Sequence, residues 1–178
     1  MPEAWLPPDV GHGIALRPWR SDDLDALVAH ANDEQVSRGT SDRFPYPYTR
    51  EDGIAFLAGR VVDLSAPVFA VTLEGRAVGG IGVRMFTGER GIGAEFGYWL
   101  GRRHWGRGVM TNVVAAFAPW AVHTLELQRL QATVLDFNHA SARVLEKNGF
   151  SEEGVLRRAV MKRGTVHDLR MFARLCVD

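Results

Sequence analysis

The chain has few or none of the features that mark several classes of protein. Its one cysteine, Cys176, cannot form an intramolecular disulfide bond, and the surrounding run MFARLCV favours a buried strand thiol over a reactive one. No run of about 18 apolar residues is present, and the start MPEAWLPPDV lacks the basic and apolar regions of a signal peptide. We therefore expect a cytoplasmic protein that is neither secreted nor membrane-spanning.

Charge of one sign is not in excess, because lysine plus arginine and aspartate plus glutamate number 21 each. No overall basic field would hold nucleic acid or an anionic membrane surface, so neither partner is expected and any phosphate binding must be local. The histidines lack the spacing of metal ligands and there is no cysteine–histidine cluster, so no metal site is expected. The histidines considered are His30, His104, His123, His139 and His167.

What is present describes an ordered α+β protein. With 178 residues, of which 46% are apolar and 24% charged, the chain predicts a single domain over residues 1–178. Apolar residues at helical spacing predict four helices, which begin after residues 21 and 49 and at residues 109 and 139. Strand-like runs occupy 13–19, 67–73, 77–86, 93–100, 129–135 and 168–177, with a hairpin region at 157–167. The predicted order is two early helices, a run of antiparallel strands, then strand–helix–strand–helix–strand.

Three local signals set the expected helix boundaries. Ser21, followed by two aspartates, predicts a helix start, and Thr49 with Asp52 resembles a capping box. Pro119 removes one backbone hydrogen bond, so we expect the helix that begins at Val109 to kink or end there. The segment SRGTSDRFPYPYT, residues 37–49, reads as a loop between the two early helices and is a candidate lid.

The stretch LGRRHWGRGVMT, residues 100–111, concentrates glycine and arginine just before a predicted helix. A helix N-terminus has unsatisfied N–H groups and a positive dipole end, and glycines let an anion approach them. Gly106 and Gly108 immediately precede the helix, and Arg102, Arg103 and Arg107 can pair with phosphate oxygens. The stretch predicts an anion cradle; the alternative is a glycine-rich turn with solvated arginines.

Two other nucleotide-binding motifs fit less well. Gly101 and Gly106 have the spacing of the glycines in a P-loop, but Arg107 and Gly108 stand where that motif needs lysine and a hydroxyl residue. The run GGIG, residues 79–82, lies in a predicted hairpin with no helix after it, which favours strand packing over dinucleotide binding.

The segment RHWGRG, residues 103–108, resembles the R/Q-x-x-G-x-G/A signature of the GNAT N-acetyltransferases, and it follows a strand and opens a helix as in that family. LRPWRSDDL, AEFGYWLGRRHWGRGVMT, NHASARVLEKNGF, EGVLR and HDLRMFARL are similar to the RimJ/RimL-type branch, named for enzymes that acetylate ribosomal-protein N-termini. The resemblance implies a GNAT fold, with a mixed, mostly antiparallel sheet that splays at the acetyl-CoA site and is flanked by helices.

The resemblance also implies where acetyl-CoA binds. In the family the pantetheine pairs with the backbone of a central strand, here residues 95–100, and the pyrophosphate sits in the glycine loop. Asn138 stands where the family commonly bonds the pantetheine amide, although a helix cap is a second role that it could combine with the first. The implied acetyl-CoA-binding residues are Tyr98, Trp99, Leu100, Arg103, Gly106, Arg107, Gly108, Val109 and Asn138.

The family chemistry is direct attack of an amine on the thioester, which needs a proton acceptor and a donor to the leaving sulfur. Glu95, on the acetyl-CoA strand, is the candidate base; a solvated or salt-bridged strand glutamate is the alternative. Many relatives carry a tyrosine where this chain has Leu145, so Ser141 is the candidate donor, unless its hydroxyl only bonds local backbone.

The implied function is N-acetyl transfer to a protein N-terminal α-amine or a small-molecule amine. An acyl-CoA-binding sensor or interaction module without turnover is the alternative, and dimers are common in the family, which leaves open a homodimer. Asn112 and Pro119 depart from the branch pattern and weaken any copied acceptor pocket. Phe44, Tyr46 and Tyr48 are the candidate acceptor-binding residues, with core packing as the alternative.

Overall fold

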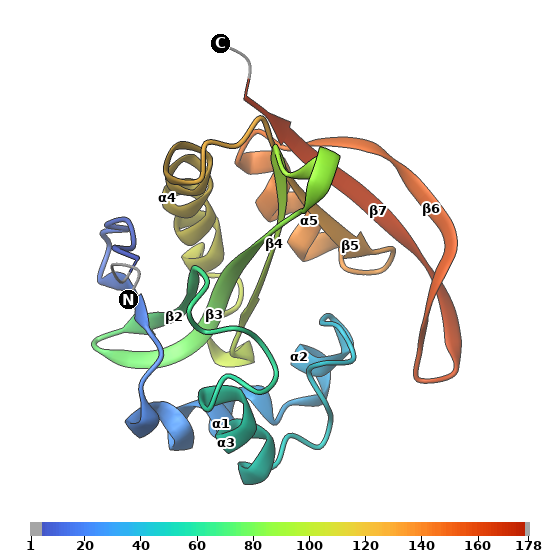
Figure 1. Ribbon diagram of the computed structural model, residues 1–178. Coiled ribbons are helices and arrows are strands. Elements are labelled where there is room, and N and C mark those ends of the chain that lie inside the picture. The colour runs from blue at the N-terminus through green and yellow to red at the C-terminus, as the bar shows by residue number, and fades with distance from the viewer. Residues whose placement is uncertain (1–4, 177–178) are drawn as a thin grey trace. The chain divides into compact units, whose positions relative to one another are not determined.

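A computed structural model describes residues 5–176 of the chain and shows an α+β fold (Figure 1). Its strands form an open seven-stranded mixed sheet in the order β1-β2-β3-β4-β5-β7-β6. The strands are β1 (Ile14–Pro18), β2 (Val68–Leu73), β3 (Arg76–Met85), β4 (Gly93–Leu100), β5 (Arg129–Leu135), β6 (Ser151–Lys162) and β7 (Thr165–Leu175). The helices are α1 (Leu24–Ala31), α2 (Glu34–Arg38), α3 (Arg50–Leu57), α4 (Val109–Thr124) and α5 (His139–Lys147), and the short 3-10 turns are η1 (Ser21–Asp23), η2 (Gly88–Arg90) and η3 (Arg102–His104).

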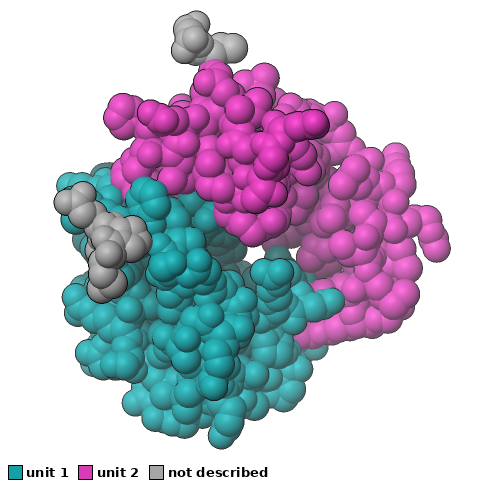
Figure 2. Space-filling model, viewed as in Figure 1, with its two compact units in different colours: residues 1–83, 97–109 teal, residues 84–96, 110–178 magenta. Residues whose placement is uncertain are grey.

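The chain divides into two compact units, shown in different colours in Figure 2. The first contains residues 1–83 and 97–109, and the second contains residues 84–96 and 110–178. The boundaries fall inside β3 and β4, so each of these strands contributes residues to both units. The glycine loop belongs to the first unit, and Asn138 and Ser141 belong to the second.

The first unit has β1, β2 and most of β3 as an antiparallel ladder, with Ile14 opposite Leu73 and Val68 opposite Gly82. Helices α1 and α3 contact each other in the same unit. A Cβ on Gly79 would collide with the Trp99 carbonyl oxygen. The glycine is therefore needed for close strand packing, which agrees with the prediction for the GGIG run.

The second unit is built on β5, β7 and β6 with the first half of β4. β4 runs parallel to β5 from Gly93 to Glu95, whereas β5 with β7 and β7 with β6 are antiparallel. The core includes stacked or tilted rings of Phe96, Phe117 and Phe150. β6 lies at one edge of the sheet, and its register with β7 shifts between Leu156 and Val160. Residues 157–159 therefore form a bulge on the edge strand.

Three boundary predictions differ from the structure. Before α1, the Asp23 carboxylate accepts a hydrogen bond from the Arg20 N–H. Ser21 lies inside the 3-10 turn, so the prediction that Ser21 caps the helix was wrong. The short helix α2 adds a third early helix, capped by Asp33. Helix α4 continues through Pro119 to Thr124, so the helix does not end at the proline, whose missing N–H removes one intrahelical hydrogen bond; a kink there stays a prediction. The Thr49–Asp52 capping box is confirmed.

Over the described span, 5–176, the helices are all too short or too polar to cross a lipid bilayer.

Candidate functional site

The glycine loop before α4 has the backbone conformation that an anion cradle requires. Gly106 and Gly108 have φ of 72° and 75°, in the left-handed region that side-chain-bearing residues rarely adopt. A Cβ at either position would meet no atom within 4 Å, so the space above the loop is open. The helix that follows begins at Val109, and its first N–H groups have no partners within the helix. Backbone donors and open space thus coincide at this loop.

The arginines of the loop have different roles. Arg102 forms an ion pair with Asp33, with 2.9 Å between Nε and the carboxylate. Arg103 and Arg107 are exposed, and neither forms an ion pair or hydrogen bond within residues 5–176. Both guanidinium groups are therefore available to an anionic ligand, whereas Arg102 anchors the loop to the start of α2.

Two imidazoles pack behind the loop, His30 from α1 and His104 from η3, with ring centroids 5.3 Å apart. The His30 ring lies so close to Gly101 that a Cβ at that position would collide with it. Burial first, and then neighbouring positive charges, lower the pKa of both histidines. The pair is neutral at neutral pH, so the positive charge of the loop comes from its arginines. The sequence pattern alone indicates no role for either histidine.

Side-chain contacts help to hold the end of the strand that leads into the loop, which also pairs with β3 in the sheet. Trp99 stacks on Trp19 with centroids 6.5 Å apart and makes an edge contact with Phe44. Leu100 is buried, and its carbonyl oxygen accepts a 2.7 Å hydrogen bond from the indole N–H of Trp105. These contacts fix the end of β4, and backbone pairing of Tyr98, Trp99 and Leu100 with pantetheine remains a prediction.

In the second unit, Asn138 and Ser141 lie together at the start of α5. The Asn138 Oδ1 atom accepts a 3.2 Å hydrogen bond from the Ser141 N–H, so the predicted helix cap is confirmed. The amide Nδ2 of Asn138 has no hydrogen-bond partner in the described part of the chain. The helix cap uses the Oδ1 atom of Asn138 and leaves its Nδ2 group as a donor. Asn138 could therefore cap α5 and also donate a hydrogen bond to a pantetheine carbonyl.

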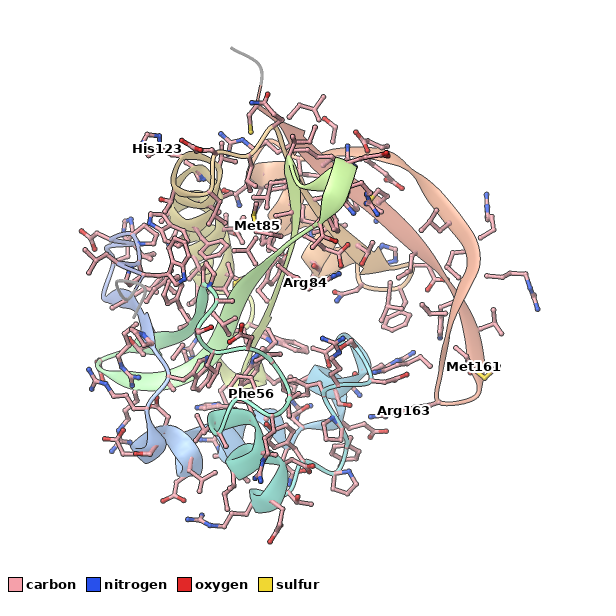
Figure 3. All side chains as sticks on the ribbon, viewed as in Figure 1. Phe56, Arg84, Met85, His123, Met161 and Arg163 are labelled. Carbon is pink, nitrogen blue, oxygen red and sulfur yellow. The ribbon has the colours of Figure 1, made fainter. Side chains whose placement is uncertain are left out.

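Glu95, the candidate base, lies in the second unit among polar side chains. Its carboxylate accepts a 3.2 Å hydrogen bond from Gln131 on β5 and lies 3.9 Å from the guanidinium of Arg84, which is labelled in Figure 3. Its side chain keeps 31% of its exposure. Gln131 in turn accepts from Arg129, so Glu95 belongs to a polar network and still has access to solvent.

The three candidate acceptor residues of the 37–49 loop separate into different environments. Tyr48 is 5% exposed and packs with Leu27 and Ala31 in a core cluster, where burial raises the pKa of its phenol to about 12. Phe44 is half-buried between Tyr48 and Trp99. Tyr46 is 47% exposed. The structure therefore brings Phe44 and Tyr48 together as packing residues and sets Tyr46 apart at the surface.

We expect Tyr48→Ala and Tyr46→Ala to have different effects. Removing a buried aromatic ring typically costs about 3–5 kcal/mol, so Tyr48→Ala should lower the melting temperature strongly. Tyr46→Ala should leave the melting temperature within about 2 °C, as for other surface changes, and alter the acceptor KM. Thermal melts of both variants with acceptor titrations of Tyr46→Ala test this. An equal loss of stability in the two variants would contradict the assignment of Tyr48 to the core and of Tyr46 to the surface.

A carboxylate–imidazole pair in the second unit has no counterpart in the sequence motifs. The Asp136 carboxylate, just after β5, lies 3.0 Å from Nδ1 of His167 on β7. No motif spacing could reveal this pair, because its members are 31 residues apart and the register of β5 with β7 brings them together. Among the described residues, no group of three or more metal-ligating side chains is present.

The sequence matches a family model described as "Acetyltransferase (GNAT) domain" over residues 14–151. The chain belongs to the GNAT acetyltransferase family. It is 29% identical over 168 residues to the uncharacterized N-acetyltransferase p20 of Bacillus licheniformis, which covers 91% of this chain and 92% of that protein. It is 32% identical over 82 residues, 46% of each protein, to the ribosomal-protein-serine acetyltransferase of Escherichia coli.

The solved structure of the ribosomal L7/L12 alpha-N-protein acetyltransferase RimL with coenzyme A is similar in fold. The TM-score is 0.83 at 22% identity, over 94% of this chain and 96% of that one. The predicted GNAT fold and the resemblance to the RimJ/RimL-type branch are confirmed, and by its family this GNAT protein is an acyltransferase.

Proposed function

We propose that this GNAT protein, acting as a single domain, transfers the acetyl group of acetyl-CoA to a primary amine by direct attack of the amine on the thioester. The observation that carries the proposal is the pair of left-handed glycines, Gly106 and Gly108, which lie just before α4 and at which a Cβ would meet open space. This loop fits a pyrophosphate, because it combines backbone donors with the two uncommitted guanidinium groups of Arg103 and Arg107. The solved relative that was bound to coenzyme A supports the same assignment.

The remaining candidate residues supply orientation and proton transfer. Asn138 Nδ2 donates to a pantetheine carbonyl while its Oδ1 keeps the α5 cap. The Ser141 hydroxyl, one turn into α5, gives a proton to the leaving sulfur. Glu95 takes a proton from the acceptor nitrogen, directly or through water. Its 31% exposure supports this role, because an acceptor or a water molecule can reach the carboxylate.

The acceptor is a protein N-terminal α-amine or a small-molecule amine. The E. coli relative is named for acetylation of a ribosomal-protein serine, which supports a protein N-terminus as the first acceptor to test. The experiment is thiol release from acetyl-CoA against N-terminal peptides and small amines, with product masses. Acetylated product supports the proposal, whereas coenzyme A binding without turnover for any acceptor would favour an acyl-CoA-binding sensor.

We expect Glu95→Gln to lower the rate most at low pH. The substitution keeps the shape of the side chain and its bond to Gln131 but removes the negative charge. At low pH more of the acceptor is protonated, so the reaction depends more strongly on a base. The pH–rate profiles of the variant and the wild type provide the measurement. Identical profiles would show that Glu95 only serves the polar network.

A further inference from the structure

The Glu95 carboxylate is held by one of its two oxygens. Its Oε2 atom accepts a 3.2 Å hydrogen bond from Nε2 of Gln131. Its Oε1 atom lies 3.9 Å from Nη2 of Arg84, which is too far for a hydrogen bond, and it accepts from no other group in residues 5–176. The two oxygens therefore differ, because Gln131 occupies Oε2 whereas Oε1 keeps an unused acceptor.

Gln131 is a buried amide, 4% exposed, and both of its polar atoms are paired. Its Oε1 atom accepts a 2.9 Å hydrogen bond from Nε of Arg129. A guanidinium group only donates and the carboxylate of a base only accepts, so the amide fits between Arg129 and Glu95 in one orientation. The opposite orientation would set two donors against each other at Arg129 and two acceptors at Glu95. Arg129 therefore makes Gln131 donate to Glu95.

Arg129 is itself fixed by two hydrogen bonds to the Glu153 carboxylate, at 2.9 and 2.7 Å. These bonds raise the pKa of Arg129 and lower that of Glu153, so both groups are charged at neutral pH. Glu153 on β6 reaches Arg129 on β5 although β7 lies between the two strands. The register of β6 with β7 shifts between Glu152 and Gly154, which leaves Glu153 as the extra residue of a bulge, and a bulge re-aims a side chain.

Strand pairing brings these side chains together. Glu95 lies opposite Gln131 in the parallel pairing of β4 with β5, so the two side chains share one face of the sheet. Arg129 precedes Gln131 by two residues on β5 and lies on that same face. Glu153 and the other three residues all belong to the second unit. The contacts that hold Glu95 therefore form within one compact part of the chain.

We propose that Gln131 is a positioning residue for the base Glu95, and that Arg129 keeps the Gln131 amide in its donating orientation. The inference rests on the proposed function, in which Glu95 takes a proton from the acceptor nitrogen. Because Gln131 holds Oε2, the carboxylate is restrained in its rotation, and Oε1 is the oxygen that takes the proton. Misplacing a catalytic group by about 1 Å can cost about 10²-fold in rate. Gln131 thus contributes to kcat without touching the substrate.

A double-mutant cycle with Glu95→Gln tests whether Gln131 acts through Glu95. In the wild-type background, Gln131→Leu should lower kcat by about 10-fold to 10²-fold and change the acetyl-CoA KM little. In the Glu95→Gln background the same substitution should change kcat by less than about 2-fold, because the base is already absent. A residue that only packs the sheet would give the same loss in both backgrounds. That result, or wild-type kcat in Gln131→Leu, would overturn the inference.

Arg129→Met tests the second step and has a matched control in the same unit. Arg170 on β7 donates two hydrogen bonds to Glu152 in the same way, and its side chain is 21% exposed against 29% for Arg129. Arg129→Met should lower kcat by less than Gln131→Leu does, because the amide stays in place but loses its fixed orientation. Arg170→Met should match the wild type. Equal losses in the two arginine variants would point to a weakened sheet and overturn the role of Arg129.

A readout that needs no turnover separates this inference from the proposed function. The side-chain amide protons of Gln131 give a pair of signals in a proton–nitrogen correlation NMR spectrum, identified by their loss in Gln131→Leu. These signals should shift in Glu95→Gln and in Arg129→Met and stay in place in Arg170→Met. Signals that do not move in Glu95→Gln and Arg129→Met would overturn the inference alone. Shifted signals together with no turnover of any acceptor by the wild type would overturn the proposed function instead.

Discussion

Replacing Gly108 with valine is expected to weaken coenzyme A binding by about 10² to 10⁴-fold. With φ of 75°, the position forces any side-chain-bearing residue into an unfavourable conformation, and a valine side chain would extend into the open space above the loop. Losing two hydrogen bonds to a charged group, at about 1.5–3 kcal/mol each, corresponds to that range. Calorimetric titration with coenzyme A measures it.

Gly75→Val is the matched control for strain. Gly75, in the turn between β2 and β3, has φ of 79°, and a Cβ at this position would likewise meet no atom within 4 Å. Both substitutions should lower the melting temperature by a similar amount, and only Gly108→Val should reduce binding. Coenzyme A should also raise the melting temperature of the wild type, since it binds the folded state. Wild-type affinity in Gly108→Val would show that the loop is an ordinary turn.

Ser141→Ala is expected to lower kcat by about 10² to 10⁴-fold, the usual contribution of a general acid. The acetyl-CoA KM should change little, because the hydroxyl acts on sulfur only as the thioester bond breaks. The backbone N–H of residue 141 still donates to Asn138, so the α5 cap should survive. Single-turnover measurements under conditions where chemistry limits the rate provide the test.

Ser151→Ala, at the exposed start of β6, is the control for loss of a hydroxyl and should keep wild-type turnover. If Ser141→Ala also kept it, the serine would be a local helix residue and another group would protonate the sulfur. Many relatives carry a tyrosine at the position of Leu145, which is fully buried here. Because this chain lacks that phenol, the test of Ser141 as the proton donor matters more.

The sequence predicted best those features that depend on neighbouring residues. Glycine permits the left-handed conformations of Gly106 and Gly108 in the predicted cradle, and the Asn138 and Thr49 caps follow from side chains within three residues of the helix start. Helix α2 was missed because its five residues are too few to show a period. The continuation of α4 past Pro119 depended on packing, which local propensity does not record.

Long-range contacts were beyond such reasoning. Tyr46 and Tyr48 are two residues apart in one loop, yet Tyr46 is exposed and Tyr48 is buried, because Tyr48 packs with Leu27 and Ala31 of α1. Asp136 and His167 meet through the register of β5 with β7, which the sequence does not determine. The fold is shown by the family and structural matches, and the variants described above test the role of each candidate site residue.

The bulge on β6 has a consequence for how the protein behaves at high concentration. An edge strand of twelve residues with exposed Val155 and Leu156 would offer a template for strands of other molecules. The irregular segment 157–159 interrupts that template with two arginines, and the Arg158 N–H is already bonded to the Asp168 carboxylate. The bulge and its positive charges thus disfavour edge-to-edge pairing and aggregation along the most exposed strand of the sheet.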